Sequence, residues 1–77
     1  MNKLIRLELK ATLKRYRPDS HDAYSIESGI CVKDLVKQLG VPEYEVYIVF
    51  IDGVLANLDS SIKDGALVTL FPPLDGG

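Results

Sequence analysis

One stretch of the sequence has helical periodicity, and it is too short to be stable alone. Its apolar residues follow the i, i+3, i+4, i+7 spacing of an amphipathic helix: Val32, Leu35, Val36 and Leu39. Gly40 stands where a left-handed helix terminator belongs, and Pro42 stops the helix from continuing. A helix of about two to three turns is marginal in water, so the apolar stripe must pack onto a sheet.

The residues before this helix predict two strands. Residues 4–10 alternate apolar and charged side chains, with Ile5, Leu7 and Leu9 on one face, and residues 11–13 continue the alternation less clearly. Residues 14–22 form a polar, proline-containing loop. Residues 23–28 predict a second strand, with Tyr24 and Ile26 as its inward positions, that pairs with the first as a hairpin.

Three further strands are predicted after the helix. Residues 46–51 (VYIVFI) are all apolar, which is typical of a central strand buried on both faces. Asp52-Gly53 predicts a tight hairpin turn into residues 54–56. Residues 57–63 are mostly polar, with Leu58 and Ile62 as anchors, and a second Asp-Gly pair turns the chain into a last strand over 67–71. Pro72-Pro73 ends that strand, because proline cannot donate to a sheet ladder.

This order predicts an α+β fold of the β-grasp (ubiquitin-like) type, a mixed four- or five-stranded sheet covered by one main helix. We expect the first and last strands to lie side by side, in parallel, at the centre of the sheet. Residues 1–71 form the predicted domain, and residues 72–77 are predicted to be a flexible tail ending in Gly-Gly.

Size and composition exclude several classes of protein. A chain of 77 residues allows one small domain and rarely contains a deep catalytic pocket. No apolar run approaches the ~18–20 residues that span a bilayer, and the alternating N-terminus is unlike a signal peptide, so we expect a cytoplasmic protein without a membrane partner. A single cysteine, Cys31, excludes an internal disulfide and multi-cysteine metal sites.

The charges divide unevenly along the chain. Residues 1–17 carry six basic side chains against one acidic, a net charge of +5, and residues 18–77 carry three against ten, a net charge of −7. The basic segment suits either contact with nucleic-acid phosphates or the solvated face of a half-exposed strand. A pI near 5.2 and the lack of interleaved aromatic and basic residues argue against nucleic acid. The acidic half is the better candidate for recognising a partner.

Two side chains could carry conventional chemistry. His21 lies in a polar loop, and the sequence has no second histidine for a metal site or a proton relay, so we expect His21 to be solvated. Cys31 lies at the start of the helix, where the helix dipole could activate a thiol, although a single cysteine between Ile30 and Val32 is more often a small buried hydrophobe. We identify no catalytic triad, phosphate-binding glycine loop or paired carboxylates.

The C-terminal residues are the most distinctive candidates. Two stiff prolines follow Phe71, and the chain ends in Gly76-Gly77. Six residues beyond Phe71 reach roughly 20 Å when extended. Glycines have no side chains to obstruct a narrow channel in another protein, so the Gly77 carboxylate could enter a partner's active site. The alternative is an ordinary frayed polar tail.

The sequence resembles the ubiquitin-like sulfur carriers, the family of the molybdopterin synthase small subunit and of the thiamine-pathway carrier. The matching segments are VKDLVKQLG at 32–40, VFIDG at 49–53, IKDG at 62–65 and LFPPLDGG at 70–77. The Phe-Pro-Pro of the last segment is closer to the molybdopterin type.

The resemblance implies that an E1-like enzyme uses ATP to adenylate Gly77, and that a sulfurtransferase or persulfide donor then converts Gly77 to a thiocarboxylate. Gly76 allows passage into the partner, and the large subunit of molybdopterin synthase is the implied acceptor. The implied docking residues are Phe71, Pro72, Pro73, Leu74 and Asp75. The chain itself binds no cofactor, metal or nucleotide in this interpretation. The alternatives are a carrier for thiamine or another thio-metabolite, a protein modifier joined to lysines, or a plain interaction or nucleic-acid module.

Overall fold

The computed structural model describes residues 2–73, which form five strands, one α-helix and two short 3-10 helices. In chain order these are β1 (Asn2–Leu9), η1 (Ala11–Tyr16), β2 (Tyr24–Glu27), α1 (Val32–Leu39), η2 (Glu43–Glu45), β3 (Ile48–Ile51), β4 (Val54–Ala56) and β5 (Leu67–Phe71). The predicted strands and helix are therefore present in the predicted order.

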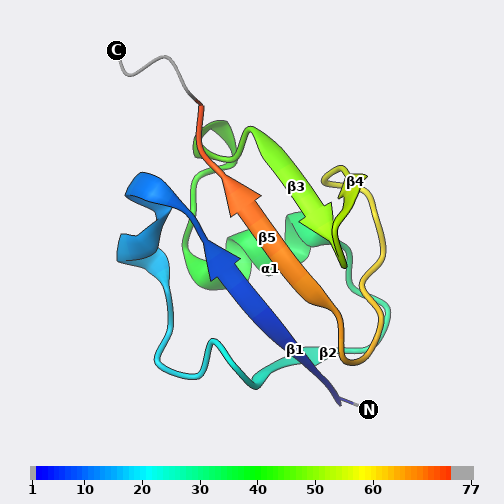
Figure 1. Ribbon diagram of the computed structural model, residues 1–77. Coiled ribbons are helices and arrows are strands. Elements are labelled where there is room, and N and C mark those ends of the chain that lie inside the picture. The colour runs from blue at the N-terminus through cyan, green and yellow to red at the C-terminus, as the bar shows by residue number, and fades with distance from the viewer. Residues whose placement is uncertain (1, 74–77) are drawn as a thin grey trace.

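The five strands form one mixed sheet in the order β2-β1-β5-β3-β4 (Figure 1). β1 and β5 are parallel, with Arg6 beside Leu67 and Leu9 beside Leu70, and the other neighbours are antiparallel. The first and last strands are thus parallel neighbours at the centre, and the predicted β-grasp topology is confirmed.

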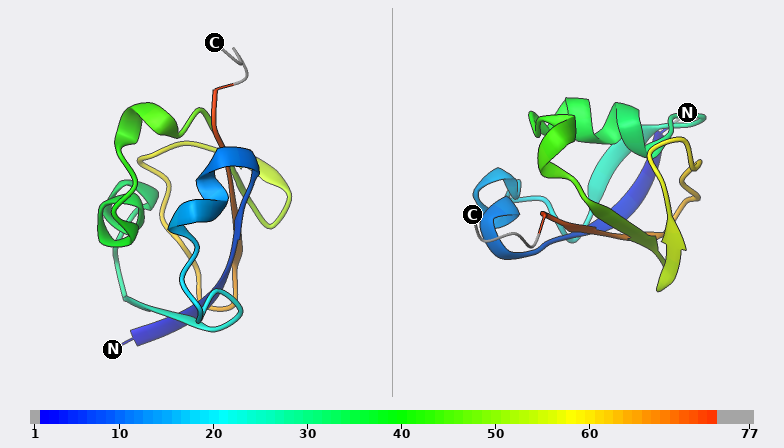
Figure 2. Two further views of the ribbon diagram at one scale, coloured as in Figure 1. Left: turned by 90° about the vertical axis from the view of Figure 1, so that its left-hand side faces the viewer. Right: turned by 90° about the horizontal axis from the view of Figure 1, so that it is seen from above.

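Helix α1 covers one face of the sheet (Figure 2). It ends at Gly40, whose φ of 79° is left-handed and whose N–H donates to the Lys37 carbonyl at 3.0 Å. The predicted stripe packs into the core, which also includes Leu13 of η1 and the predicted anchor Ile62. The buried apolar residues are Ile5, Leu7, Leu9, Leu13, Ile26, Val32, Leu35, Val36, Val41, Val49, Ile62, Ala66, Val68 and Leu70. An eight-residue helix is stable here because it shares this core.

The turn between β3 and β4 has the predicted geometry. Asp52 and Gly53 have φ values of 52° and 79°, as a primed hairpin turn requires at its two central positions. The Asp52 Oδ1 also accepts a hydrogen bond from the Leu67 N–H at 2.9 Å. This side chain therefore ties the turn to the start of β5.

The interpretation of residues 46–51 as a strand buried on both faces is wrong. The strand is shorter, Ile48–Ile51, and only Val49 in it is buried. The reason is that α1 packs against one face, while no element in the described part of the chain covers the other (Figure 2). Half of the apolar run therefore belongs to an open sheet surface.

The segment between β1 and β2 also differs from the prediction. Residues 11–16 form η1 rather than a fading strand and the start of a loop, and this 3-10 helix begins at Ala11, whose φ is 50°. Residues 43–45 form η2, which the sequence did not predict. His21 is half-buried rather than solvated, because its carbonyl accepts the Leu7 N–H at 2.8 Å, beyond the point where β2 stops pairing with β1.

Candidate functional site

The last strand is held firmly until its final residue. In β5, Val68 and Leu70 are buried on the helix side, and β1 and β3 pair with the strand on its two sides. The Lys10 N–H donates to the Leu70 carbonyl at 3.0 Å, and the Tyr47 N–H donates to the Phe71 carbonyl at 2.8 Å. The chain therefore reaches Phe71 as part of a rigid sheet.

The structure describes only some of the predicted site residues, namely those up to Pro73. Phe71 is half-buried, Pro72 is buried, and Pro73 is exposed. Leu74, Asp75, Gly76 and Gly77 lie outside the described residues, so their predicted roles in docking and chemistry stay predictions. What the structure provides is the base from which those residues continue.

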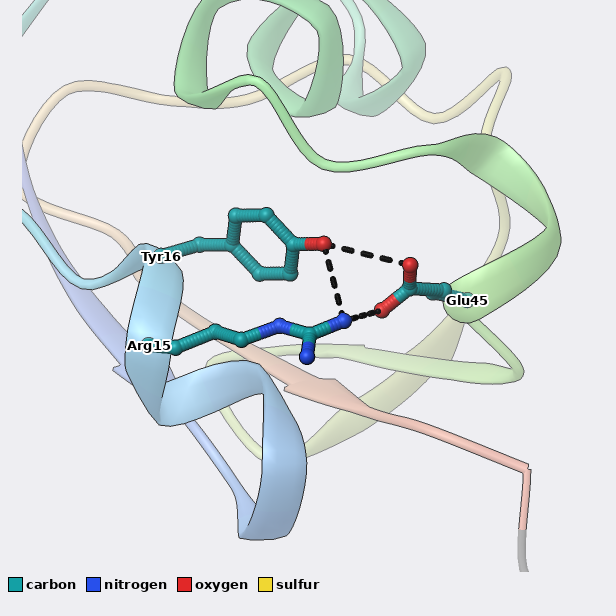
Figure 3. A network of polar contacts seen from close by, with 3 residues as sticks. All are labelled: Arg15, Tyr16 and Glu45. Atoms are coloured by element: carbon teal, nitrogen blue, oxygen red, sulfur yellow. Dashed lines mark hydrogen bonds and ion pairs between the residues drawn. The ribbon is translucent and has the colours of Figure 1, made fainter.

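A network of polar contacts links η1 to η2 near the end of β5 (Figure 3). The Arg15 Nη2 lies 2.9 Å from the Glu45 Oε1, and the Tyr16 hydroxyl donates to the Glu45 Oε2 at 3.1 Å. The same Arg15 nitrogen donates to the Tyr16 hydroxyl at 3.1 Å, and the guanidinium lies over the Tyr16 ring at 5.0 Å from its centroid. These contacts with Tyr16, and then with Glu45, raise the pKa of Arg15 above its ordinary value. We refer to these three residues as the η1–η2 clamp.

The sheet surface opposite α1 is mostly apolar over β3, β4 and β5, with the polar Thr69 between Leu67 and Phe71. Pairing places Ile48 beside Phe71 and Phe50 beside Leu55, and the rings of Phe50 and Phe71 meet edge to face at 5.8 Å. Leu55 is 69% exposed. We call this surface the open face and define it by Ile48, Phe50, Leu55, Leu67 and Phe71.

An exposed apolar surface that borders the root of a tail is suited to binding another protein. The sequence analysis found Phe71 but missed the other residues of the open face. The signal was present in the run at 46–51, which also fits a strand with one buried and one open apolar face.

Cys31, for which a reactive thiol and a small buried hydrophobe were the two interpretations, has a structural role at the start of α1. Cys31 is the N-cap of α1 and is half-buried, and its N–H and Sγ both donate to the Asp34 Oδ2, at 3.1 and 3.3 Å. The backbone hydrogen bond, followed by the thiol hydrogen bond, lowers the pKa of the Asp34 carboxyl. A carboxylate beside the sulfur is the opposite of the electropositive surroundings that activate a thiol.

Comparison with known proteins identifies the family. The family model for the Mut7-C ubiquitin matches residues 4–75, nearly the whole chain. The chain belongs to the Mut7-C ubiquitin family. This result agrees with the ubiquitin-like resemblance and with the β-grasp sheet. No curated protein matches the sequence.

Solved structures show the same fold as this Mut7-C ubiquitin chain. The "putative molybdopterin converting factor, subunit 1" of Pyrococcus furiosus is 23% identical, with a TM-score of 0.63 over 94% of this chain and 99% of that one. SAMP1 of Haloferax volcanii is 22% identical, with a TM-score of 0.64 over 96% and 99%. The HVO 2177 protein of the same organism is 18% identical, with a TM-score of 0.73 over 99% and 88%. At these identities the similarity establishes the fold of the Mut7-C ubiquitin domain.

Two features are absent from residues 2–73, the part of this Mut7-C ubiquitin domain that the structure describes. No group of three or more His, Cys, Asp or Glu side chains in this range could hold a metal ion. No helix in the same range is long and apolar enough to cross a membrane.

Proposed function

We propose that this chain is a ubiquitin-like sulfur carrier whose chemistry takes place at the carboxylate of Gly77. The observation that supports the proposal most directly is the position of β5. β5 is the central strand of the sheet, and its hydrogen bonds to neighbouring segments continue as far as its last residue, Phe71. The sequence then continues through two prolines to Gly76-Gly77. Membership of a ubiquitin family supports the same function.

The proposed cycle needs only one reactive group from this chain. An E1-like enzyme binds the domain and ATP, and the Gly77 carboxylate attacks the α-phosphate, giving an acyl adenylate and pyrophosphate. A persulfide from a sulfurtransferase then displaces AMP, and a second thiol cleaves the resulting acyl disulfide. The products are a thiocarboxylate on Gly77 and a disulfide on the donor side. Gly76 has no side chain to obstruct passage into the partner's site, and the partner rather than this chain uses the ATP.

We place the carrier in the synthesis of the molybdenum or tungsten cofactor, in the cytoplasm. The Phe-Pro-Pro of residues 71–73 and the likeness to the Pyrococcus furiosus protein support this placement. The acceptor of the sulfur is then the large subunit of molybdopterin synthase. A carrier for thiamine or another thio-metabolite would use the same carboxylate with a different acceptor.

The open face supports docking onto such partners. It starts at Phe71 and extends across β3 to Leu55, so a partner that covers it would hold the root of the tail at the same time. Half-buried and exposed apolar side chains around Phe71 favour recognition of the folded domain as well as of residues 71–75.

Intact mass spectrometry tests the proposal. The protein is incubated with an E1-like enzyme, ATP, a persulfide source and a thiol, and its mass is measured. Exchange of one oxygen for sulfur at Gly77 is the expected result, and it requires that residue to be the C-terminus of the mature protein. High-mass adducts at lysines of other proteins would indicate a modifier instead. An unchanged mass would contradict both functions and leave an interaction module.

A pair of variants tests docking through the open face. Leu55→Asp places a charge on that face, whereas Val54→Asp places one on the neighbouring residue, which is 68% exposed and lies on the opposite side of β4. We expect Leu55→Asp to slow loading roughly ten-fold and Val54→Asp to leave the rate nearly unchanged. Equal rates for the two variants would contradict docking through this face.

A further inference from the structure

A basic cavity lies beside β1, and Leu67 is the one residue that it shares with the open face. Its volume is about 270 Å³, and five basic side chains line it: Arg6, Lys10, Lys14, Arg17 and His21. They come from three segments, namely β1 with the residue after it, η1 with the residue after it, and the loop that follows (Figure 1). Basic residues from neighbouring elements are thus brought to one hollow.

The backbone holds these segments in place. The Leu7 N–H donates to the His21 carbonyl at 2.8 Å, which fixes the loop against β1. The Arg17 N–H donates to the Lys14 carbonyl at 3.1 Å, which closes the last turn of η1. The η1–η2 clamp holds η1 from its other side through Arg15 and Tyr16. The cavity is therefore built on fixed backbone rather than on loose side chains.

The charges in the cavity are not neutralised internally. Two carboxylates also line it, but each has a partner: Glu8 lies 3.9 Å from the Lys10 Nζ, and Asp22 lies 3.3 Å from the His21 Nδ1. Among residues 2–73, neither Arg6, Lys14 nor Arg17 has a carboxylate within 4.0 Å. Three residues with permanent positive charges thus line a small space in a protein whose net charge is −2.

We propose that this cavity binds a compact phosphate anion, of the size of orthophosphate or pyrophosphate. Arginine donates paired N–H groups in the planar geometry that suits phosphate oxygens, and lysine adds a point charge. The volume lies just below the ~300–1,000 Å³ typical of small-ligand sites, which favours a small anion over a whole nucleotide. The lining contains no Phe, Tyr or Trp on which a base could stack, which disfavours single-stranded nucleic acid.

Amide NMR with the full chain and no activating enzyme tests the proposal independently of the sulfur-carrier function. The 15N-labelled protein is titrated with pyrophosphate at constant ionic strength. We expect saturable shifts at the amides of residues lining the cavity, such as Leu7, Leu9 and Arg17. Shifts that are spread over the surface, or that do not saturate, would overturn the proposal.

Two double variants with the same loss of charge locate the site. Lys14→Ala/Arg17→Ala removes two cations from the cavity, whereas Lys33→Ala/Lys37→Ala removes two from the exposed side of α1. We expect the first variant to bind pyrophosphate at least roughly ten-fold more weakly and the second to bind it within about two-fold of the unsubstituted chain. The thermal unfolding midpoint of each variant is measured as well, to check that the variant folds.

Equal weakening by the two variants would mean a general charge effect and would overturn the proposal. A short single-stranded RNA serves as the second ligand. RNA binding without pyrophosphate binding would also overturn it, because the site would then recognise an extended phosphodiester backbone.

Discussion

At the scale of single residues, Asp34 shows how a polar side chain supports the only α-helix in the described range. Its carboxylate accepts hydrogen bonds from the Cys31 N–H and Sγ and lies in the first turn of α1, where a negative charge interacts favourably with the helix dipole. The hydrogen bonds favour the charged form, so the pKa of Asp34 is lower in the folded protein than in the unfolded chain.

This difference predicts a dependence of stability on pH. A carboxyl whose pKa is lowered by folding contributes stability above its unfolded pKa, and that contribution is lost as the pH falls below about 4 and through the folded pKa. We expect Asp34→Asn to be less stable than the unsubstituted protein at pH 7, with the gap closing at lower pH. Urea unfolding from pH 7 to pH 2 measures it.

Asp59→Asn is the matched control, because Asp59 is exposed and the described hydrogen bond at this residue is made by its backbone N–H. A gap for Asp34→Asn that stays constant with pH, or that appears equally for Asp59→Asn, would contradict the assignment.

At the scale of elements, the η1–η2 clamp joins two short 3-10 helices that have little regular structure of their own. Each of these helices flanks the end of β5. Lys10, just before η1, donates its N–H to the Leu70 carbonyl, and Tyr47, shortly after η2, donates its N–H to the Phe71 carbonyl. The clamp therefore helps to hold the place where the tail begins. Its Tyr16–Glu45 hydrogen bond is partly buried, whereas Arg15 is exposed.

We expect Tyr16→Phe to lower the free energy of unfolding by about 1 kcal/mol, because it removes the hydroxyl that donates to Glu45. Tyr44→Phe is the control within η2, since Tyr44 is 81% exposed. Urea denaturation followed by circular dichroism measures both. Indistinguishable midpoints for the two variants would show that the Tyr16 hydroxyl contributes no stability.

At the scale of the whole molecule, the core and the proposed reactive end are separate. The last buried residue in the described part of the chain is Pro72, and the core residues precede it. The domain then serves as a folded support, and the proposed chemistry belongs to residues that follow it in the sequence.

Deletion of Gly76-Gly77 should therefore abolish thiocarboxylate formation while leaving the thermal midpoint unchanged. Leu70→Ala should have the opposite effect on stability, with a loss of about 2–5 kcal/mol, because Leu70 is fully buried in β5. Calorimetry and intact mass measure the two properties. A truncated protein that still supplied sulfur would contradict the carrier function. A truncated protein that unfolded would contradict the separation of the folded core from the proposed reactive end.

The fold was largely predictable because its signals are local and periodic. The stripe of α1, the alternation of residues 4–10 and the Asp52-Gly53 turn each depend on neighbours within a few residues. The site was predictable only in part. Phe71 and the two prolines are visible in the sequence, but Phe50 and Leu55 join Phe71 only through strand pairing.

The sequence by itself determined the order of the strands and the α-helix, the ends of that helix and the residues that follow β5, because propensity, periodicity and proline act through local backbone geometry. Only the tertiary structure decided which face of residues 48–51 stays open, and that Arg6, Lys14 and Arg17 surround one cavity. The physical reason is that burial and electrostatic fields depend on which segments pack together. One helix can cover one face of a sheet, and charges distant in sequence converge only when the sheet and its loops are assembled.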